Sequence, residues 1–506
     1  MPEERQTGLK QVDTYMADVS TIRALDAVKA LAFIGDLSMG QPTDHSLRTS
    51  WLAGRLAAEA GHDDVQCGVV KEVSLLRWSG CTANAADFSE MLGDDIGGRE
   101  AMLAMRPGWG GAAEAQGRLD ATITPLAEIH CEVSGEIARM LGLEGSTQAA
   151  LRNIFETWDG GGQPRRIEGS RVPEAVFLVA VAGDLEILSR VYGLESAQKL
   201  IAQKAGRHYP EVFARIACAQ AGEWLTELDQ QSAAGRDEPL DALPMQQGTA
   251  PEIIADVIDL KLPWMAGYSR RVAEAAARCC ARLGLDEEVS RTTYLAGLIH
   301  GMGRMAVSNA IWNTPGRLSP AAWEKVRLVP YWTARAGKQI GALARESEIA
   351  SQAYERLDGT GYFRGASGNM LGREARVLAA AASWVALLSP RPWRAAFKAD
   401  EAAALLSEHA AAGLYDADSV HALLSCEKDG YEAGADRIKP ARGALLSPRE
   451  AEVLWHISQG GSNKEVARTL GMSPSTVRTH VESVFRKLEC STRAAATLKA
   501  STLGLI

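Results

Sequence analysis

Helix-start signals crowd the end of the chain and limit what this region can fold into. Serines precede three segments here, and two of them are followed three residues later by a glutamate, the spacing of a capping box. A proline stands directly after two of the serines, at the first helical position, where its missing N–H does no harm. The pattern predicts four short helices, with Ser491 as the cap of the last. The signal residues are Ser447, Pro448, Glu450, Ser462, Glu465, Ser473 and Pro474.

The third of these helices has two chemically different faces. Its apolar stripe recurs at intervals of four, three and four residues, at Val477, Val481, Val484 and Leu488. The opposite side is polar, and a helix in the DNA major groove needs this arrangement, with one side anchored and the other reaching base edges. We predict base contacts by Arg478 to guanine, Thr479 to a thymine methyl and Glu482 to cytosine. An amphipathic helix with a solvated polar face is the alternative.

The charge of the chain is unevenly distributed. Its 506 residues carry a formal net charge of −9, whereas residues 440–506 carry +4 and leave −13 for the rest. A basic tail on an acidic body favours double-stranded DNA as the partner of the tail. The residues expected at the DNA backbone are Ser462, Asn463, Lys464, Thr476, His480 and Lys487.

The tail resembles the LuxR/GerE family of helix-turn-helix regulators. The resemblance implies a recognition helix in the major groove and a fourth helix that supports dimerisation. It assigns base reading to the same three residues, although Glu482 stands where the family often has a basic residue. The matching runs are Leu446-Ser447-Pro448-Arg449-Glu450, Ser462-Asn463-Lys464-Glu465-Val466-Ala467, Ser473-Pro474-Ser475-Thr476-Val477-Arg478-Thr479-His480 and Arg486-Lys487-Leu488.

The remainder of the chain predicts further helices. Alanine is frequent, β-alternation is not seen, and hydrophobic content is 46% with 23% charged residues, as in a soluble globular protein. We expect a cytoplasmic protein, because no signal peptide or apolar stretch of roughly 18 residues is present and the eight cysteines form no C-x-x-C pair. The predicted fold class is all-α: two helical domains at 1–229 and 252–428, a linker at 230–251, and the tail domain at 442–506.

The two large domains read as copies of each other. Trp158-Asp159-Gly160-Gly161-Gly162 matches Leu357-Asp358-Gly359-Thr360-Gly361 at an offset of 199 residues, and His45 matches Tyr268 at an offset of 223. An insertion within 93–119 of the first copy would account for the change of offset. Chance similarity between alanine-rich helices is the alternative.

The second copy resembles the HD-GYP branch of the HD phosphohydrolases. Its resembling runs are His300-Gly301-Met302-Gly303, Asn309 to Leu318, Glu355 to Tyr362 and Pro390-Arg391-Pro392. The resemblance implies metal ions, held by His and Asp, that activate water for attack on a phosphodiester such as cyclic di-GMP. Of the seven ligand positions only His300 is kept. The replacements are Tyr268, Gly301, Val329, Ala353, Tyr354 and Ser383.

The first copy keeps three possible ligands, but Arg77-Trp78 and Ile154-Phe155 replace the His-Asp and His-His pairs. We therefore expect no catalysis, no metal and no cofactor, and instead a pocket for an unknown small-molecule effector; a body filled by these side chains and used only for dimerisation is the alternative. The expected pocket residues are His45, Trp78, His130, Phe155, Asp184, Tyr268, His300 and Tyr354.

Together these features predict a homodimeric transcriptional regulator on a pseudo-palindromic operator, without membrane attachment. RNA polymerase is a further candidate partner. A metal-dependent cyclic-dinucleotide phosphodiesterase with a DNA-binding tail is the rival interpretation, and a scaffold that uses the tail for protein contacts is the third.

Overall fold

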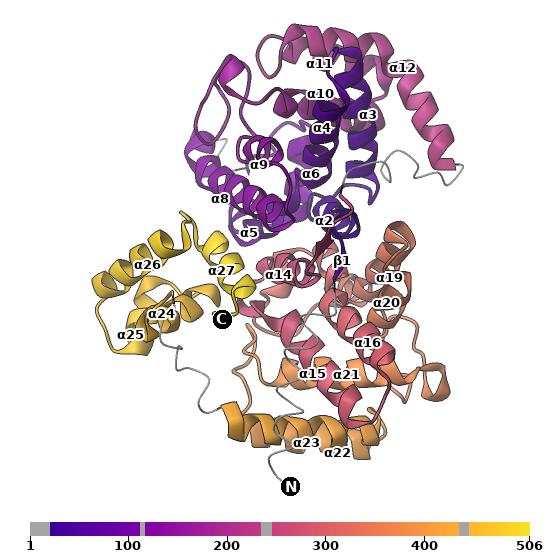
Figure 1. The fold of residues 1–506 in the computed structure, drawn as a ribbon, viewed down its shortest axis with the longest axis vertical. Helices are drawn as coiled ribbons and strands as arrows, with labels where there is room; N and C mark the ends of the chain where they lie inside the picture. The colour runs from indigo at the N-terminus through magenta and orange to yellow at the C-terminus, as the bar shows by residue number, and fades with distance from the viewer. Residues whose placement is uncertain (1–20, 112–116, 234–244, 435–444) are drawn as a thin grey trace. The chain divides into compact units, whose positions relative to one another are not determined.

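The computed structural model describes residues 21–111, 117–233, 245–434 and 445–506 (Figure 1). Within these ranges the only sheet is a pair of two-residue strands, β1 (Ile22–Arg23) and β2 (Gly248–Thr249), and nearly all other regular structure is helical. The prediction of an all-α chain is confirmed. Parts of the predicted linker at 230–251, and of the stretch between the second and third predicted domains, lie outside the described residues.

The chain divides into two compact units, residues 23–247 with 308–310, and residues 248–307 with 311–506. In the first unit α3, α4 and α10 pack against one another, and α3 and α10 carry two of the five predicted first-copy pocket residues, His45 and Asp184. The helices of this unit are α2 (Ala24–Ser38), α3 (His45–Glu59), α4 (Asp64–Leu76), α5 (Ala85–Leu92), α6 (Asp95–Leu103), α8 (Leu119–Met140), α9 (Gly145–Leu151), α10 (Glu174–Tyr192), α11 (Leu194–Lys204) and α12 (Glu211–Ala233), with 3-10 turns η1 (Ser79–Thr82) and η2 (Gly169–Arg171).

In the second unit α15 packs against α16 and α21. Its helices before the tail are α14 (Glu252–Leu260), α15 (Tyr268–Arg282), α16 (Glu287–Ile299), α17 (Asn309–Trp312), α18 (Pro320–Arg327), α19 (Val329–Ile340), α20 (Ala344–Ala350), α21 (Arg373–Leu387), α22 (Ala399–Ala411) and α23 (Ala417–Gly434), with 3-10 turns η3 (Pro263–Met265), η4 (Met302–Ala306) and η5 (Gly368–Met370).

The two sequence offsets recur in the structure. α3 and α15 begin at His45 and Tyr268, and α9 and α20 begin 199 residues apart. The residue after each helix start is fixed in the same way: Ser46 donates from its N–H and hydroxyl to Asp36 at 3.0 and 2.6 Å, and Ser269 does so to Asp259 at 2.7 and 2.7 Å. α6 lies within 93–119, where an insertion in the first copy was predicted, and α5 lies directly before this range. These correspondences support the interpretation of the two regions as copies.

The tail folds as the capping pattern predicts. α24 (Pro448–Ser458), α25 (Asn463–Leu470) and α26 (Pro474–Leu488) are capped by Ser447, Ser462 and Ser473, the first two with complete capping boxes. The cap of α27 (Arg493–Thr502) was predicted one residue too early, because the side chain of Thr492 accepts from the Ala495 N–H.

Within the described ranges, no helix has both the length and the apolarity that crossing a lipid bilayer requires. All eight cysteines are free thiols, and most of them are buried.

Candidate nucleic-acid interface and core sites of the HD-type region

The exposed face of α26 carries the three predicted base-contact residues. The apolar stripe of this helix is buried, and it packs with side chains of α24, α25 and α27 in one core. Arg478, Thr479 and Glu482 are exposed on the other side. The helix is therefore anchored along one side and free along the other, as contact with base edges requires.

Arg478 and Glu482 form an ion pair with each other. The Nε of Arg478 donates to Glu482 Oε1 at 2.8 Å, and the two side chains are 75% and 62% exposed. An exposed pair of this kind contributes only about 0.3–0.5 kcal/mol, so a guanine edge or a phosphate can displace it. The carboxylate at position 482 thus sets the resting direction of the arginine.

The predicted backbone-contact residues differ in how freely they can reach a phosphate. Lys464 and Thr476 are exposed, and Ser462 is exposed at the N-terminus of α25. Asn463 is half-buried, and its Oδ1 accepts from Arg493 at 2.7 Å. His480 is half-buried. These contacts remain predictions.

Lys487 is held inside the tail domain. Its Nζ donates to Glu450 Oε2 at 2.7 Å, and Ser483 donates to the other oxygen at 2.7 Å. Burial opposes ionisation of this carboxyl, but the hydrogen bonds from Lys487, Ser447 and Ser483 lower the pKa of Glu450 to about 2. The ammonium group therefore already has an anionic partner in the absence of DNA.

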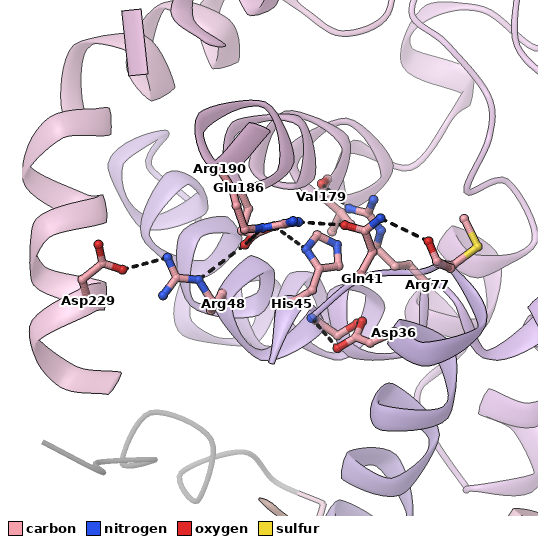
Figure 2. Close-up of polar contacts among 11 residues, drawn as sticks. Asp36, Gln41, His45, Arg48, Arg77, Val179, Glu186, Arg190 and Asp229 are labelled. Atoms are coloured by element: carbon pink, nitrogen blue, oxygen red, sulfur yellow. Dashed lines mark hydrogen bonds and ion pairs between the residues drawn. The ribbon is translucent and has the colours of Figure 1, made fainter. Parts of the chain in front are cut away.

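In the first copy, one buried carboxylate organises the start of α3 and the end of α10. Figure 2 shows Glu186 of α10 between His45, Arg48 and Arg190. His45 Nδ1 lies 2.5 Å from Glu186 Oε2, Arg190 donates to both carboxylate oxygens at 3.2 Å, and Arg48 Nε lies 3.5 Å away. Burial alone would raise the pKa of Glu186, but His45 and Arg190 together lower it to about 2. Burial lowers the pKa of His45, so the neutral ring donates from Nδ1.

Three further residues predicted in this pocket form an aromatic cluster. His130 lies 4.6 Å from Phe155 and 6.3 Å from Trp78, measured between ring centroids. His130 Nε2 donates to the backbone oxygen of Arg77 at 2.8 Å, and burial lowers the pKa of this histidine to about 3. Asp184 is engaged elsewhere, because its carboxylate accepts from Lys204 at 2.8 Å.

In the second copy, Arg304 joins the three predicted pocket residues. Its Nη2 donates to His300 Nε2 at 2.9 Å and to the hydroxyl of Tyr354 at 2.8 Å, and its guanidinium lies 5.0 Å from the centroid of the Tyr268 ring. His300 Nδ1 is 2.6 Å from the Gly297 oxygen, so both ring nitrogens are occupied. Tyr268 donates to the Ala382 oxygen at 3.0 Å.

Arg77, Glu186 and Arg304 were not among the predicted site residues. Arg77 stands at the position matched to His300. We treated it only as the loss of a metal ligand and did not consider that it also adds a positive charge. Arg304 follows His300 by four residues, at the passage from the end of α16 to η4, and this short separation could have linked the two residues. Glu186 has one partner at the i,i+4 spacing of its own helix, Arg190, which the sequence could have indicated, whereas His45 and Arg48 come from α3.

Comparisons with known proteins match two parts of the chain to protein families. Residues 252–419 match the HD domain family, and residues 444–500 match the family of bacterial regulatory proteins of the luxR family. The 3'3'-cGAMP-specific phosphodiesterase 3 of Vibrio cholerae serotype O1 is 24% identical over 406 residues, which cover 74% of this chain and 88% of that protein. A crystal structure of a cyclic GMP-AMP specific phosphodiesterase of V. cholerae (V-cGAP3) shares the fold, with a TM-score of 0.58 at 20% identity, over 81% of this chain and 98% of that one.

The tail has its own relatives. The transcriptional activator protein CarR of Pectobacterium carotovorum subsp. carotovorum is 48% identical over 65 residues. This match spans 13% of the chain and about a quarter, 27%, of the activator. It therefore concerns the helix-turn-helix domain alone.

Two predictions are corrected by these comparisons. The prediction that the chain is not an enzyme is wrong, because the relative that shares most of the chain and the structure that shares the fold are phosphodiesterases. The prediction that no cofactor is involved is contradicted by the same relatives, since the HD-GYP resemblance implies metal-dependent hydrolysis. Because the relatives are phosphodiesterases and the resemblance implies a metal, hydrolase activity has to be measured for this chain.

The described side chains at the expected ligand positions do not fit a metal ion. Both nitrogens of His300 are hydrogen-bonded, and the Arg304 guanidinium occupies the adjacent space. Over residues 21–111, 117–233, 245–434 and 445–506, no group of three or more His, Cys, Asp or Glu side chains is arranged to hold one. What the sequence and the structure establish is a chain in which an HD domain precedes a helix-turn-helix domain of the luxR family of bacterial regulatory proteins.

Proposed function

We propose that this protein is a transcriptional regulator that reads DNA with α26 and whose HD-type region binds a small-molecule effector. The observation that carries the proposal is the exposed Arg478, Thr479 and Glu482 face of a helix whose other side is fixed in a core. The match of the tail to the luxR family supports DNA as its partner. As a homodimer, the protein would contact two half-sites about 10 base pairs apart.

Binding of duplex DNA at graded salt concentrations tests the proposal. Operator candidates would be selected from random duplexes with the full chain. We expect log Kd to rise linearly with log salt concentration, because each phosphate contact releases about 0.9 counterion. The same slope for selected and random duplexes, together with tighter binding of the selected ones, would show that base contacts add to phosphate contacts. Failure of the full chain to bind any duplex DNA at low salt concentration would refute the proposal.

The aromatic and arginine side chains at the centre of the second copy support an effector with an anionic group and flat rings. Arg391 lies 5.0 Å from the ring centroids of both Trp264 and Tyr268, and Arg304 lies on the same tyrosine. Burial and the neighbouring arginines lower the pKa of Arg391 to about 10. We propose that this site takes a cyclic dinucleotide, the ligand class that the names of the V. cholerae and Xanthomonas campestris relatives print.

Cyclic-dinucleotide hydrolysis is the second candidate function, and the 88% coverage of the V. cholerae phosphodiesterase favours it. The assay would follow 3'3'-cGAMP and cyclic di-GMP with Mn²⁺, with Fe²⁺, and with chelator. If the chain is a phosphodiesterase, a linear dinucleotide accumulates in proportion to protein, and His300→Ala lowers its rate of formation at least about tenfold. Binding of the same compounds without turnover would assign them the effector role alone.

A further inference from the structure

In the first copy, the buried charge of Arg77 lacks a close anionic partner. Its side chain follows α4 and is 6% exposed. With the described residues the guanidinium makes one hydrogen bond, from Nη1 to the Val179 oxygen at 3.3 Å, and it lies 4.0 Å from the centroid of the Trp78 ring. No carboxylate of the described residues lies within 4.0 Å of it. A buried charge in this condition is costly unless an anion compensates it.

The carboxylates nearest to this guanidinium are all committed to other groups. Asp36 accepts two hydrogen bonds from Ser46, Asp184 binds Lys204, and Glu186 binds His45 and Arg190. Their negative charges raise the pKa of Arg77, but burial lowers it by more, and the resulting pKa is about 10. At neutral pH the guanidinium therefore remains a cation that can accept a further anion.

Two orphaned polar atoms lie beside Arg77, and each defines one requirement of a ligand. His45 Nε2 and Trp78 Nε1 are buried, and neither has a hydrogen-bond partner in the described part of the chain. Because His45 donates from Nδ1 to Glu186, its Nε2 carries a lone pair and needs a donor. Trp78 has only an N–H and needs an acceptor. His45 begins α3 and Arg77 follows α4, and these two helices pack against each other; Figure 2 labels both side chains.

Space for the guanidinium is provided by a glycine. A Cβ at Gly183 on α10 would lie 1.9 Å from Arg77 Nη1, so a larger residue here would displace the arginine. The guanidinium is thus in contact with both Gly183 of α10 and the Trp78 ring.

We propose that the first copy binds a monoprotonated phosphate group, free or as a phosphate monoester, between Arg77, His45 and Trp78. Its anionic oxygens accept from the guanidinium and the indole N–H, and its P–OH donates to His45 Nε2. Carboxylates and sulfate lack the proton for the last bond at neutral pH, whereas a phosphate monoester with a second pKa near 6 retains it in part. The proposal extends the effector role in the proposed function to a second site and a second ligand class.

Titration of the full chain with inorganic phosphate, sulfate and GMP at constant ionic strength tests this site. Binding would be measured by calorimetry and, for the two phosphorus compounds, by ³¹P NMR. We expect saturable phosphate binding, with sulfate at least about tenfold weaker, because it cannot donate to His45. GMP binding tighter than phosphate would identify a monoester as the ligand, and the reverse would identify free phosphate. Equal affinities for phosphate and sulfate would overturn the proposal.

Variants locate the binding. Arg77→Met should lower phosphate affinity at least about tenfold, whereas Arg106→Met, which removes an exposed arginine of the same copy, should not change it. Trp78→Phe keeps an aromatic side chain and removes the indole N–H together with the five-membered ring, so it should weaken binding about fivefold even if Arg77→Met fails to fold. Unchanged phosphate affinity in Trp78→Phe and in folded Arg77→Met overturns the proposal. DNA binding, measured on the same preparations, reports separately on the proposed function.

Discussion

Replacing Arg478 by alanine is expected to weaken binding to a selected operator by about 1–3 kcal/mol, or roughly 5- to 150-fold in Kd, and to relax base preference at one position. The guanidinium is 75% exposed on the free face of α26 and is restrained only by Glu482. Breaking that exposed pair costs little free energy, so most of the favourable free energy of the bidentate contact to guanine contributes to binding. Fluorescence anisotropy with operator variants would measure both effects.

Arg468→Ala is the matched control for this substitution. It removes one positive charge from the exposed surface of α25 and leaves α26 unchanged. Any loss of affinity should then be uniform across sequences, as for a phosphate contact. If Arg478→Ala also weakens all sequences equally, or has no effect, the assignment of base reading to α26 fails.

The tail shows how far local sequence signals determine structure. Serine caps, capping boxes and the valine stripe act over one or two helical turns, so the caps at Ser447, Ser462 and Ser473 and the buried face of α26 were predictable. The error at Ser491 has a local cause as well. Two hydroxyl residues stand side by side there, and only the backbone decides that Thr492 is the cap.

The HD-type region shows where such reasoning stops. Pocket residues could be matched to family positions, and the structure does gather Tyr268, His300 and Tyr354 around one arginine. The arginines themselves were missed, because charged side chains are rarely buried unless a tertiary partner is present. Such partners come from helices far apart in the sequence, as with Glu186 on α10 and His45 on α3. The prediction of a non-enzyme was drawn from the missing ligands, and the relationship to the 3'3'-cGAMP-specific phosphodiesterase 3 of V. cholerae contradicts it.

The largest expected effect on stability comes from Glu186, whose removal should lower the free energy of unfolding of the first unit by about 3–5 kcal/mol. Glu186→Ala leaves the buried Nδ1–H of His45 without an acceptor and leaves Arg48 and Arg190 without their shared anion. In a unit of this size, a loss of 3–5 kcal/mol lowers the Tm by about 10 °C. Glu195→Ala, which breaks an exposed i,i+4 pair with Lys199, should change stability by less than about 0.5 kcal/mol. Calorimetry that resolves the first unit would measure both variants.

The same carboxylate predicts the direction of the acid response. Because the folded-state pKa of Glu186 is lowered to about 2 from an ordinary value of 4.5, its contribution is fully present above about pH 4.5 and is lost as the pH falls through 2. The stability difference between wild type and Glu186→Gln, which cannot ionise, should therefore shrink as the pH is lowered from 5 towards 2. A difference that stays constant over this range would show that the charge of Glu186 does not stabilise the start of α3, and that shape and hydrogen bonding alone hold His45 in place.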